Sequence, residues 1–243
     1  MFQKIKKAIP NTLTCCNLVS GCVATMFAFQ QSYELALLWI VIGAVFDFFD
    51  GMSARALHVS SNIGKELDSL ADDITFGFAP SAMLYSLLTQ MVFPDYLAFG
   101  EEWLPYVAFV MAAFSGVRLA KFNLDTRQTL TFIGLPTPAN ALFWGALVAS
   151  FWSGMITMSW LVPVLLVGIL AFSLFLIAEI PLFALKFKNY SWADNKIKYV
   201  FLAGSMVLLV VFGVKGISMC IAWYIALALS LYAFSSKKNL NNQ

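Results

Sequence analysis

The feature that most constrains this chain is a series of apolar stretches, each long enough to cross a lipid bilayer. A membrane-spanning helix needs about 20 apolar residues to cross roughly 30 Å of hydrocarbon. Because backbone groups inside a bilayer have no water to bond, each stretch satisfies its own hydrogen bonds as a helix. We therefore expect an all-α, polytopic membrane bundle of about eight transmembrane helices. The expected spans are approximately 12–31, 34–57, 64–91, 103–122, 137–155, 158–180, 197–214 and 216–235.

Composition argues against a water-soluble domain. Apolar residues make up 60% of the 243 residues and charged residues only 12%, whereas soluble domains carry about 25% charged residues. A soluble fold of this length could not cover so much apolar surface. We expect one membrane-embedded domain over residues 1–243, with 236–243 as a flexible tail and with membrane lipids around it. The net charge of +2 gives no indication of a nucleic-acid partner.

The positions of the basic residues predict how the chain is oriented. If the N-terminus lies in the cytoplasm, every lysine and arginine except Lys215 falls on the cytoplasmic side, as the positive-inside rule requires. An even number of spans then returns the C-terminus to the same side. We expect both termini to be cytoplasmic and the protein to reside in the cytoplasmic (inner) cell membrane. The third span, which contains Gly77 and Pro80, is expected to be tilted or locally broken near those residues.

One strongly polar stretch, residues 47–73, interrupts the apolar pattern. Residues three or four apart lie on the same face of a helix. Asp47 and Asp50 therefore share a face at the end of the second span, while Asp68 and Asp72 share a face of the third. A short turn between antiparallel helices lets the two faces meet. We expect the four carboxylates to converge just inside the cytoplasmic membrane boundary.

Such a cluster needs a cation. Charged groups at membrane depth are paired or functional, and Arg55 and Lys65 are too few to neutralise four carboxylates. Ligands that are all oxygen atoms favour Mg²⁺, Mn²⁺ or Ca²⁺ over zinc. The pattern predicts two divalent ions, Mg²⁺ or Mn²⁺ with Ca²⁺ able to bind, and such pairs clamp phosphate oxygens in phosphoryl transfer. A cation channel or transporter with intramembrane carboxylates is the alternative from another class.

The spacing of this stretch resembles the signature of the CDP-alcohol phosphatidyltransferases. The matching residues are Asp47-x-x-Asp50-Gly51-x-x-Ala54-Arg55 and, after a gap of eight residues, Gly64-x-x-x-Asp68-x-x-x-Asp72. The resemblance implies that a hydroxyl attacks the β-phosphate of a CDP-linked lipid and expels CMP. It implies two metal ions on the four aspartates and Asp72 as the general base. The implied nucleotide contacts are Gly51, Ala54, Arg55 and Gly64, with Asn11 and Thr14 near the start of the chain.

Three other segments resemble the branch of this family that transfers the phosphatidyl group to serine. They are DSLADDITFGFAP over 68–80, RLAKFN over 118–123 and FIGLPTPAN over 132–140. The resemblance implies CDP-diacylglycerol and L-serine as substrates and a homodimer as the assembly. Serine brings a carboxylate, for which Arg118 and Lys121 are the expected partners, with Arg127 close by. Glycerol 3-phosphate and inositol phosphate remain alternative acceptors, although their dianionic phosphates should need a denser basic pocket.

Overall fold

The protein is described by a computed structural model over residues 2–59, 61–124, 132–182 and 191–240. Within these ranges the α-helices are α1 (Phe2–Phe29), α2 (Tyr33–Ala56), α3 (Asn62–Asp72), α4 (Ala79–Leu88), α5 (Ala108–Leu124), α6 (Thr137–Met155), α7 (Leu161–Ile177), α8 (Trp192–Phe212) and α9 (Lys215–Leu240). The other helical segments are η1 (Asp73–Phe78), η2 (Asp95–Gly100) and η3 (Leu104–Val107). Two short strands, β1 (Phe132–Ile133) and β2 (Pro181–Leu182), pair in antiparallel register. The expected all-α fold is confirmed.

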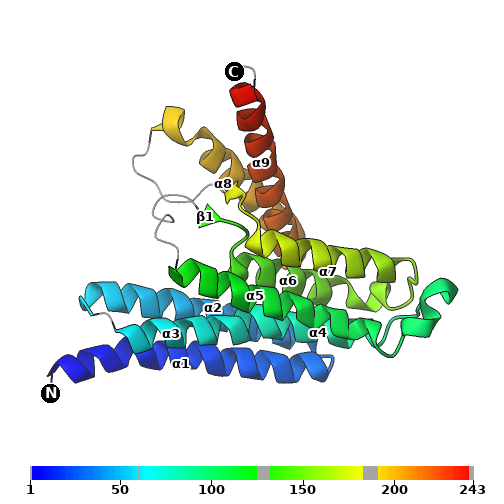
Figure 1. Cartoon of the computed structure of the whole chain (residues 1–243), viewed down its shortest axis with the longest axis horizontal. Helices are drawn as coiled ribbons and strands as arrows, with labels where there is room; N and C mark the ends of the chain where they lie inside the picture. The colour runs from blue at the N-terminus through cyan, green and yellow to red at the C-terminus, as the bar shows by residue number, and fades with distance from the viewer. Residues whose placement is uncertain (1, 60, 125–131, 183–190, 241–243) are drawn as a thin grey trace.

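The helices form a bundle from which the last pair departs (Figure 1). Helices α1 to α7 lie roughly along one another, while α8 and α9 leave this bundle at a steep angle. The α1 helix packs against α2, α3 and α4, and α5 packs against α7 and η1. The core consists of buried apolar side chains from most of these helices, such as Ile40, Phe76, Met83 and Ile169.

Membrane-spanning character is clearest in five helices of the described part of the chain. These are long and apolar enough to cross a bilayer: Ala8–Phe29, Tyr33–Ala56, Leu104–Leu124, Asp194–Phe212 and Lys215–Tyr232. Leu161–Ile177 is a shorter apolar helix. The helical segments coincide with the expected spans, although the number that cross the membrane and the orientation of the termini remain predictions. In the expected tail, the backbone is helical as far as Leu240, and residues 241–243 lie outside the described residues.

The third helical stretch changes its winding where the sequence predicts a break. Residues 73–78 form a π-helical turn between α3 and α4, and the Ala79 amide bonds to the Ile74 carbonyl five residues back. The ring of Pro80 would collide with the carbonyl of Phe76 in a regular α-helix, so the wider turn gives it room. Such turns are often found at functional sites. This one begins at Asp73, directly after the last aspartate of the motif.

Candidate active site

The structure brings the four aspartates of the motif together. Asp47 and Asp50 lie in the last turns of α2, and Asp68 and Asp72 lie on α3. One carboxylate oxygen from each of Asp47, Asp50 and Asp68 lies within 4.8 Å of the other two. The carboxyl group of Asp72 is within hydrogen-bonding reach of Asp47. The helical spacing therefore predicts this convergence correctly.

Helix α1 holds two of these carboxylates in place. The Thr14 hydroxyl donates to Asp50 Oδ2 over 2.6 Å, and the Asn17 amide nitrogen donates to Asp72 Oδ1 over 3.0 Å. Thr14 and Asp50 are 3% and 6% exposed, so their hydrogen bond is shielded from water. The resemblance in sequence implies Thr14 as a nucleotide contact but indicates no function for Asn17. Its position three residues after Thr14, on the same helical face, was the available signal.

Close packing of three helices fixes the position of Asn17. A Cβ atom at Gly43 of α2 would lie 2.5 Å from Thr75 Cγ2 and 2.9 Å from Asn17 Oδ1. The Thr75 hydroxyl donates to the Asn17 carbonyl over 2.9 Å. Small residues let membrane helices approach closely. Gly43 therefore allows α1, α2 and η1 to meet beside the aspartate cluster.

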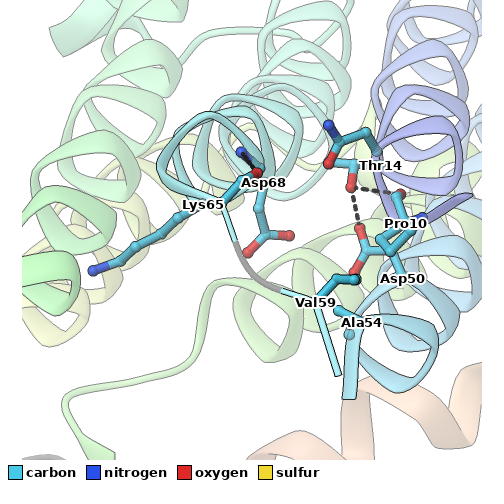
Figure 2. Close-up of a pocket in the computed structure, with 11 residues that line it drawn as sticks. Pro10, Thr14, Asp50, Ala54, Val59, Lys65 and Asp68 are labelled. Atoms are coloured by element: carbon cyan, nitrogen blue, oxygen red, sulfur yellow. Dashed lines mark hydrogen bonds between the residues drawn. The ribbon is translucent and has the colours of Figure 1, made fainter. Parts of the chain in front are cut away.

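A cavity of about 260 Å³ opens beside the cluster (Figure 2). Its lining comes from α1, the end of α2, the turn that follows and the start of α3, and includes the Asp50 and Asp68 carboxylates. Five predicted nucleotide contacts are among the lining residues: Asn11, Thr14, Gly51, Ala54 and Gly64. The remaining lining residues are not predicted from the sequence: Pro10, Val59, Ser61 and Lys65.

The turn between α2 and α3 shapes one wall of this cavity. His58 adopts a left-handed conformation with φ 51°, which reverses the chain after α2. The Ser61 hydroxyl then accepts a hydrogen bond from the Gly64 amide over 3.0 Å and so caps the start of α3. A Cβ atom at Gly64 would lie 2.9 Å from Ser61 Oγ and 3.0 Å from Asn11 Oδ1. Gly64 therefore leaves room for both polar groups at the cavity wall.

Arg55 lies next to the cavity without being part of its lining. Its side chain is exposed, and its guanidinium folds back over Gly51, where a Cβ atom would lie 3.4 Å from the nearest guanidinium nitrogen. A guanidinium in this position is free to turn toward a phosphate group near Gly51. The predicted contact of Arg55 with the nucleotide stays a prediction.

The two residues predicted to bind the acceptor differ sharply in environment. Arg118 of α5 is only 7% exposed and lies close enough to Asp72 for their charges to interact. Lys121, one turn further along α5, is exposed. Arg127 lies outside the described residues. Of the two described candidates, Arg118 is the one that the structure brings to the aspartate cluster.

A hydrogen-bonded bridge links α3 to the end of α5, the helix that carries Arg118. The Asn123 amide nitrogen donates to Ser69 Oγ over 2.7 Å, and Lys65 Nζ donates to the Asn123 carbonyl over 2.7 Å. These bonds tie the end of α5 to the helix that carries Asp68 and Asp72. Asn123 lies in the RLAKFN segment, and the sequence alone predicts no function for it.

The donor set of the cluster fits a divalent cation. Three carboxylate oxygens lie within 4.8 Å of one another, and all three belong to aspartates. No ion pair with Arg118 or Arg55 is formed by these groups among the described residues, so a bound cation is the natural means to offset their mutual repulsion. Oxygen ligands of this kind suit Mg²⁺, Mn²⁺ or Ca²⁺. The site can therefore hold a metal next to the cavity whose wall includes Gly51, Ala54 and Gly64.

Comparison with known proteins agrees with this geometry. Residues 7–151, more than half of the chain, match the family described as CDP-alcohol phosphatidyltransferase. The chain belongs to the CDP-alcohol phosphatidyltransferase family. Both the aspartate cluster and Arg118 lie within the matched residues. From this family membership and the five long apolar helices, we infer that the chain is a multi-pass membrane protein.

Relatives of this protein that are similar in sequence come from bacteria and archaea. A CDP-diacylglycerol–serine O-phosphatidyltransferase of Bacillus subtilis is 37% identical over 134 residues, which are 54% of this chain and 69% of that protein. A protein of the same name from Mycobacterium leprae is 32% identical over 184 residues, 72% of this chain and 57% of that protein. An archaetidylserine synthase of Methanothermobacter thermautotrophicus is 29% identical over 140 residues, 56% of this chain and 55% of that protein. The chain thus matches about half to two thirds of the length of these relatives.

Proposed function

We propose that this protein is a phosphatidylserine synthase, which transfers the phosphatidyl group of CDP-diacylglycerol to the hydroxyl of L-serine and releases CMP. The observation that carries the proposal is the buried Arg118 facing Asp72 at the edge of the aspartate cluster. A guanidinium beside the proposed base can hold a carboxylate-bearing acceptor with its hydroxyl next to that base. The names of the Bacillus and Mycobacterium relatives support the same acceptor.

The four aspartates Asp47, Asp50, Asp68 and Asp72 would hold two divalent ions, Mg²⁺ or Mn²⁺, with Ca²⁺ able to bind. When bound, such ions neutralise the phosphate oxygens and the charge that develops on the departing CMP. The protein's own contribution is the arrangement of the ligands. Thr14 orients Asp50 and Asn17 orients Asp72 through the hydrogen bonds described above.

The chemical step we propose is a direct displacement at phosphorus. The serine hydroxyl oxygen forms a bond to the phosphorus that carries the diacylglycerol, and the bond from that phosphorus to the oxygen of CMP breaks. The bonding electrons leave with CMP, and the hydroxyl proton passes to the Asp72 carboxylate. The hydrogen bond that Asn17 donates to Asp72 Oδ1 orients the carboxylate that takes the proton.

The donor nucleotide is proposed to occupy the cavity between α1, α2 and α3. Gly51 and Ala54 present little side chain there, so the CDP group can approach the helix backbone. Asn11, Gly64 and Arg55 are the proposed neighbours of the base, sugar and phosphates, and the fatty chains of the lipid extend into the bilayer. We place this cavity and both termini on the cytoplasmic side, because the basic residues Arg55, Lys65, Arg118 and Lys121 lie at this end of the bundle.

Two alternatives have less support. Glycerol 3-phosphate and inositol phosphate carry dianionic phosphates, and Arg118 is the only buried basic side chain near Asp72 in the described ranges. A cation transporter needs neither the cavity nor the fixed positions of Gly51 and Ala54, and membership in the CDP-alcohol phosphatidyltransferase family argues against it.

The acceptor is tested directly with purified protein in lipid nanodiscs. CDP-diacylglycerol and Mg²⁺ or Mn²⁺ are supplied, and CMP release is measured with L-serine, glycerol 3-phosphate or inositol phosphate. We expect CMP release that depends on both serine and the metal and that stops when EDTA is added. Release with one of the phosphorylated alcohols and none with serine would overturn the proposed acceptor while leaving the family chemistry intact. We also propose a homodimer, which cross-linking in nanodiscs would test.

A further inference from the structure

Asp73, which the proposed mechanism does not use, lies against helix α5. A Cβ atom at Gly116 would lie 3.4 Å from Asp73 Oδ2, and a Cβ atom at Gly77 would lie 2.7 Å from Asp73 Oδ1. The carboxylate therefore occupies space that two glycines leave open, one on its own helix and one on α5. The Asp73 side chain leaves the helix at a position about 100° around the helix axis from the Asp72 side chain, because successive residues differ by this angle. Asp73 is thus placed beside the aspartate cluster without being a member of it.

Three buried polar atoms on η1 and α5 have no hydrogen-bond partner among the described residues. They are Asp73 Oδ1, Ser115 Oγ and Arg118 Nε, and all three are buried. Ser115 is 0% exposed and Arg118 is 7% exposed. The point where a Cβ of Gly77 would stand lies 2.7 Å from Asp73 Oδ1 and 3.3 Å from Ser115 Oγ, so these two atoms lie close to each other against Gly77. We call Asp73, Ser115 and Arg118 the α5 polar cluster.

Ser115 differs from other buried serines in this protein. Ser81 and Ser173 each donate to the carbonyl four residues earlier over 2.7 Å, to Gly77 and Ile169 respectively. That bond is the usual way for a serine in a membrane helix to satisfy its hydroxyl. Ser115 makes no such bond in the described structure. Its hydroxyl is therefore left without a hydrogen-bond partner close to the Asp73 carboxylate.

Buried polar groups without partners are costly, and native proteins keep few of them. Here one unpaired group is a carboxylate oxygen, which can only accept a hydrogen bond when it is ionised. Another is a guanidinium N–H, which can only donate. Arg118 and Ser115 are three residues apart and share a face of α5. A ligand that fits this cluster must donate to Asp73 and accept from Arg118, and an α-amino acid zwitterion carries both kinds of group on one carbon.

We propose that Asp73 and Ser115 form the subsite for the α-ammonium group of an amino-acid acceptor, with its carboxylate on Arg118 and its hydroxyl at Asp72. This inference rests on the proposed function and deepens it by assigning the ammonium group, which the mechanism above leaves without a partner. Three attachment points on one small molecule also select its handedness. Under this proposal the α5 polar cluster and Asp72 together bind an amino acid that bears a hydroxyl group, and the protein uses one of its enantiomers in preference to the other.

The first test uses the wild-type protein in nanodiscs with CDP-diacylglycerol and Mn²⁺, and compares four acceptors. L-Serine carries all three groups, D-serine reverses their arrangement, 3-hydroxypropionate lacks the ammonium, and ethanolamine lacks the carboxylate. We expect kcat/KM for L-serine to exceed that for 3-hydroxypropionate by about 10- to 100-fold, because the charge-assisted hydrogen bonds to Asp73 are lost. Equal use of L-serine and 3-hydroxypropionate would overturn the inference. No serine-dependent CMP release at all would instead overturn the proposed function.

The second test changes the subsite itself. In D73N the KM for L-serine should rise by about 10- to 100-fold, the preference over 3-hydroxypropionate and over D-serine should fall, and the KM for CDP-diacylglycerol should stay within about twofold. E66Q is the matched control, because Glu66 is an exposed acid on the adjacent helix α3, and it should behave as wild type. An unchanged serine KM in D73N would contradict the subsite, as would an equal loss for all four acceptors.

A third variant keeps the test decisive if D73N is not recovered as folded protein. S115A removes only a hydroxyl from a position with no hydrogen bond to lose among the described residues, so it should fold. We expect a smaller rise in the serine KM, about threefold, with a weaker preference over 3-hydroxypropionate. The proposal would be overturned if S115A had wild-type kinetics and the wild-type protein used L-serine and 3-hydroxypropionate equally well.

Discussion

The two sides of the aspartate cluster differ in how their polar groups are satisfied. On the donor side, formed by α1, α2 and α3, the Thr14 hydroxyl and the Asn17 amide already bond to Asp50 and Asp72. On the acceptor side, formed by η1 and α5, the polar atoms of Asp73, Ser115 and Arg118 lack partners among the described residues. Because the protein itself holds the carboxylates on the donor side, that side can bind the same CDP-linked lipid whichever acceptor is used. A site with unpaired groups is completed by the acceptor itself.

The difference predicts which kinetic quantity each side controls. Changes on the donor side should reduce turnover with every acceptor, because they disturb the machinery that all acceptors share. Changes on the acceptor side should raise the KM for serine and alter the choice of acceptor. Four substitutions test this division, from the largest expected effect to the smallest.

The largest effect is expected from Asp68→Asn. Removal of one carboxylate from the cluster weakens the site that would hold the metal and stabilise the transition state, so kcat should fall by at least about 1,000-fold. CMP release measured with L-serine and with any secondary acceptor should fall alike. The exposed Glu66 on the same helix gives the control variant Glu66→Gln, which should retain full activity. A loss confined to serine would break the proposed division.

Arg118→Ala should raise the KM for L-serine by about 100-fold, because the acceptor carboxylate loses a bidentate, charge-assisted partner. The KM for CDP-diacylglycerol should change little, and discrimination between serine and ethanolamine should weaken. Lys121→Ala is the matched control from the exposed side of the same helix, and we expect a change below about threefold. If Lys121→Ala had the larger effect on the serine KM, the acceptor would lie outside the buried cluster.

Asn17→Ala should lower kcat by about 10-fold, the lower end of what is typical for a residue that orients a metal ligand. Asn17 is a positioning residue, so the KM for serine should stay nearly constant while turnover falls. Asn17→Gln, which retains the amide, should recover part of the loss. Thr12→Ala, at an exposed position of α1, is the control. A rise in the serine KM without loss of kcat would place Asn17 on the acceptor side instead.

The smallest effect is expected from Asn123→Ala, which removes one hydrogen bond between α3 and α5. The serine KM should rise by about threefold, because a single neutral hydrogen bond contributes about 1 kcal/mol and Arg118 would be held less firmly. Ser69→Ala removes the other partner. The two substitutions should be non-additive when combined, and full additivity would show that the bridge does not act through this bond.

Much of the donor side could be predicted from the sequence because it depends on local helix geometry. Asp47 and Asp50 are three residues apart, and Asp68 and Asp72 are four apart, so each pair shares a face wherever its helix lies. The turn of a few residues between α2 and α3 then leaves little freedom in how the two faces meet. A local break in the third span was also foreseeable, because Pro80 cannot continue a regular helix without relieving its collision with Phe76; its form, a π-helical turn, was not predicted.

Other parts of the site required long-range packing and were not predictable in this way. Asn17 bonds to Asp72 across 55 positions of sequence, and Thr14 to Asp50 across 36. The sequence predicts Arg118 and Lys121 together as acceptor-binding residues, since both are basic residues near one helix end. Only the packing of α5 against η1 and α3 separates them, by burying Arg118 beside Asp72 and leaving Lys121 exposed.

The sequence by itself determined that the protein is a helical membrane protein, that four carboxylates converge, and to which family the protein belongs. These follow from apolar length and from a helical repeat that the backbone imposes on any such segment. The tertiary structure decided which side of α5 faces the cluster, which α1 residues hold the carboxylates, and that Asp73 lies in a space left by Gly77 and Gly116. Those outcomes depend on how helices far apart in the chain fit against one another, because side-chain volumes and glycine positions on both partners set each contact together.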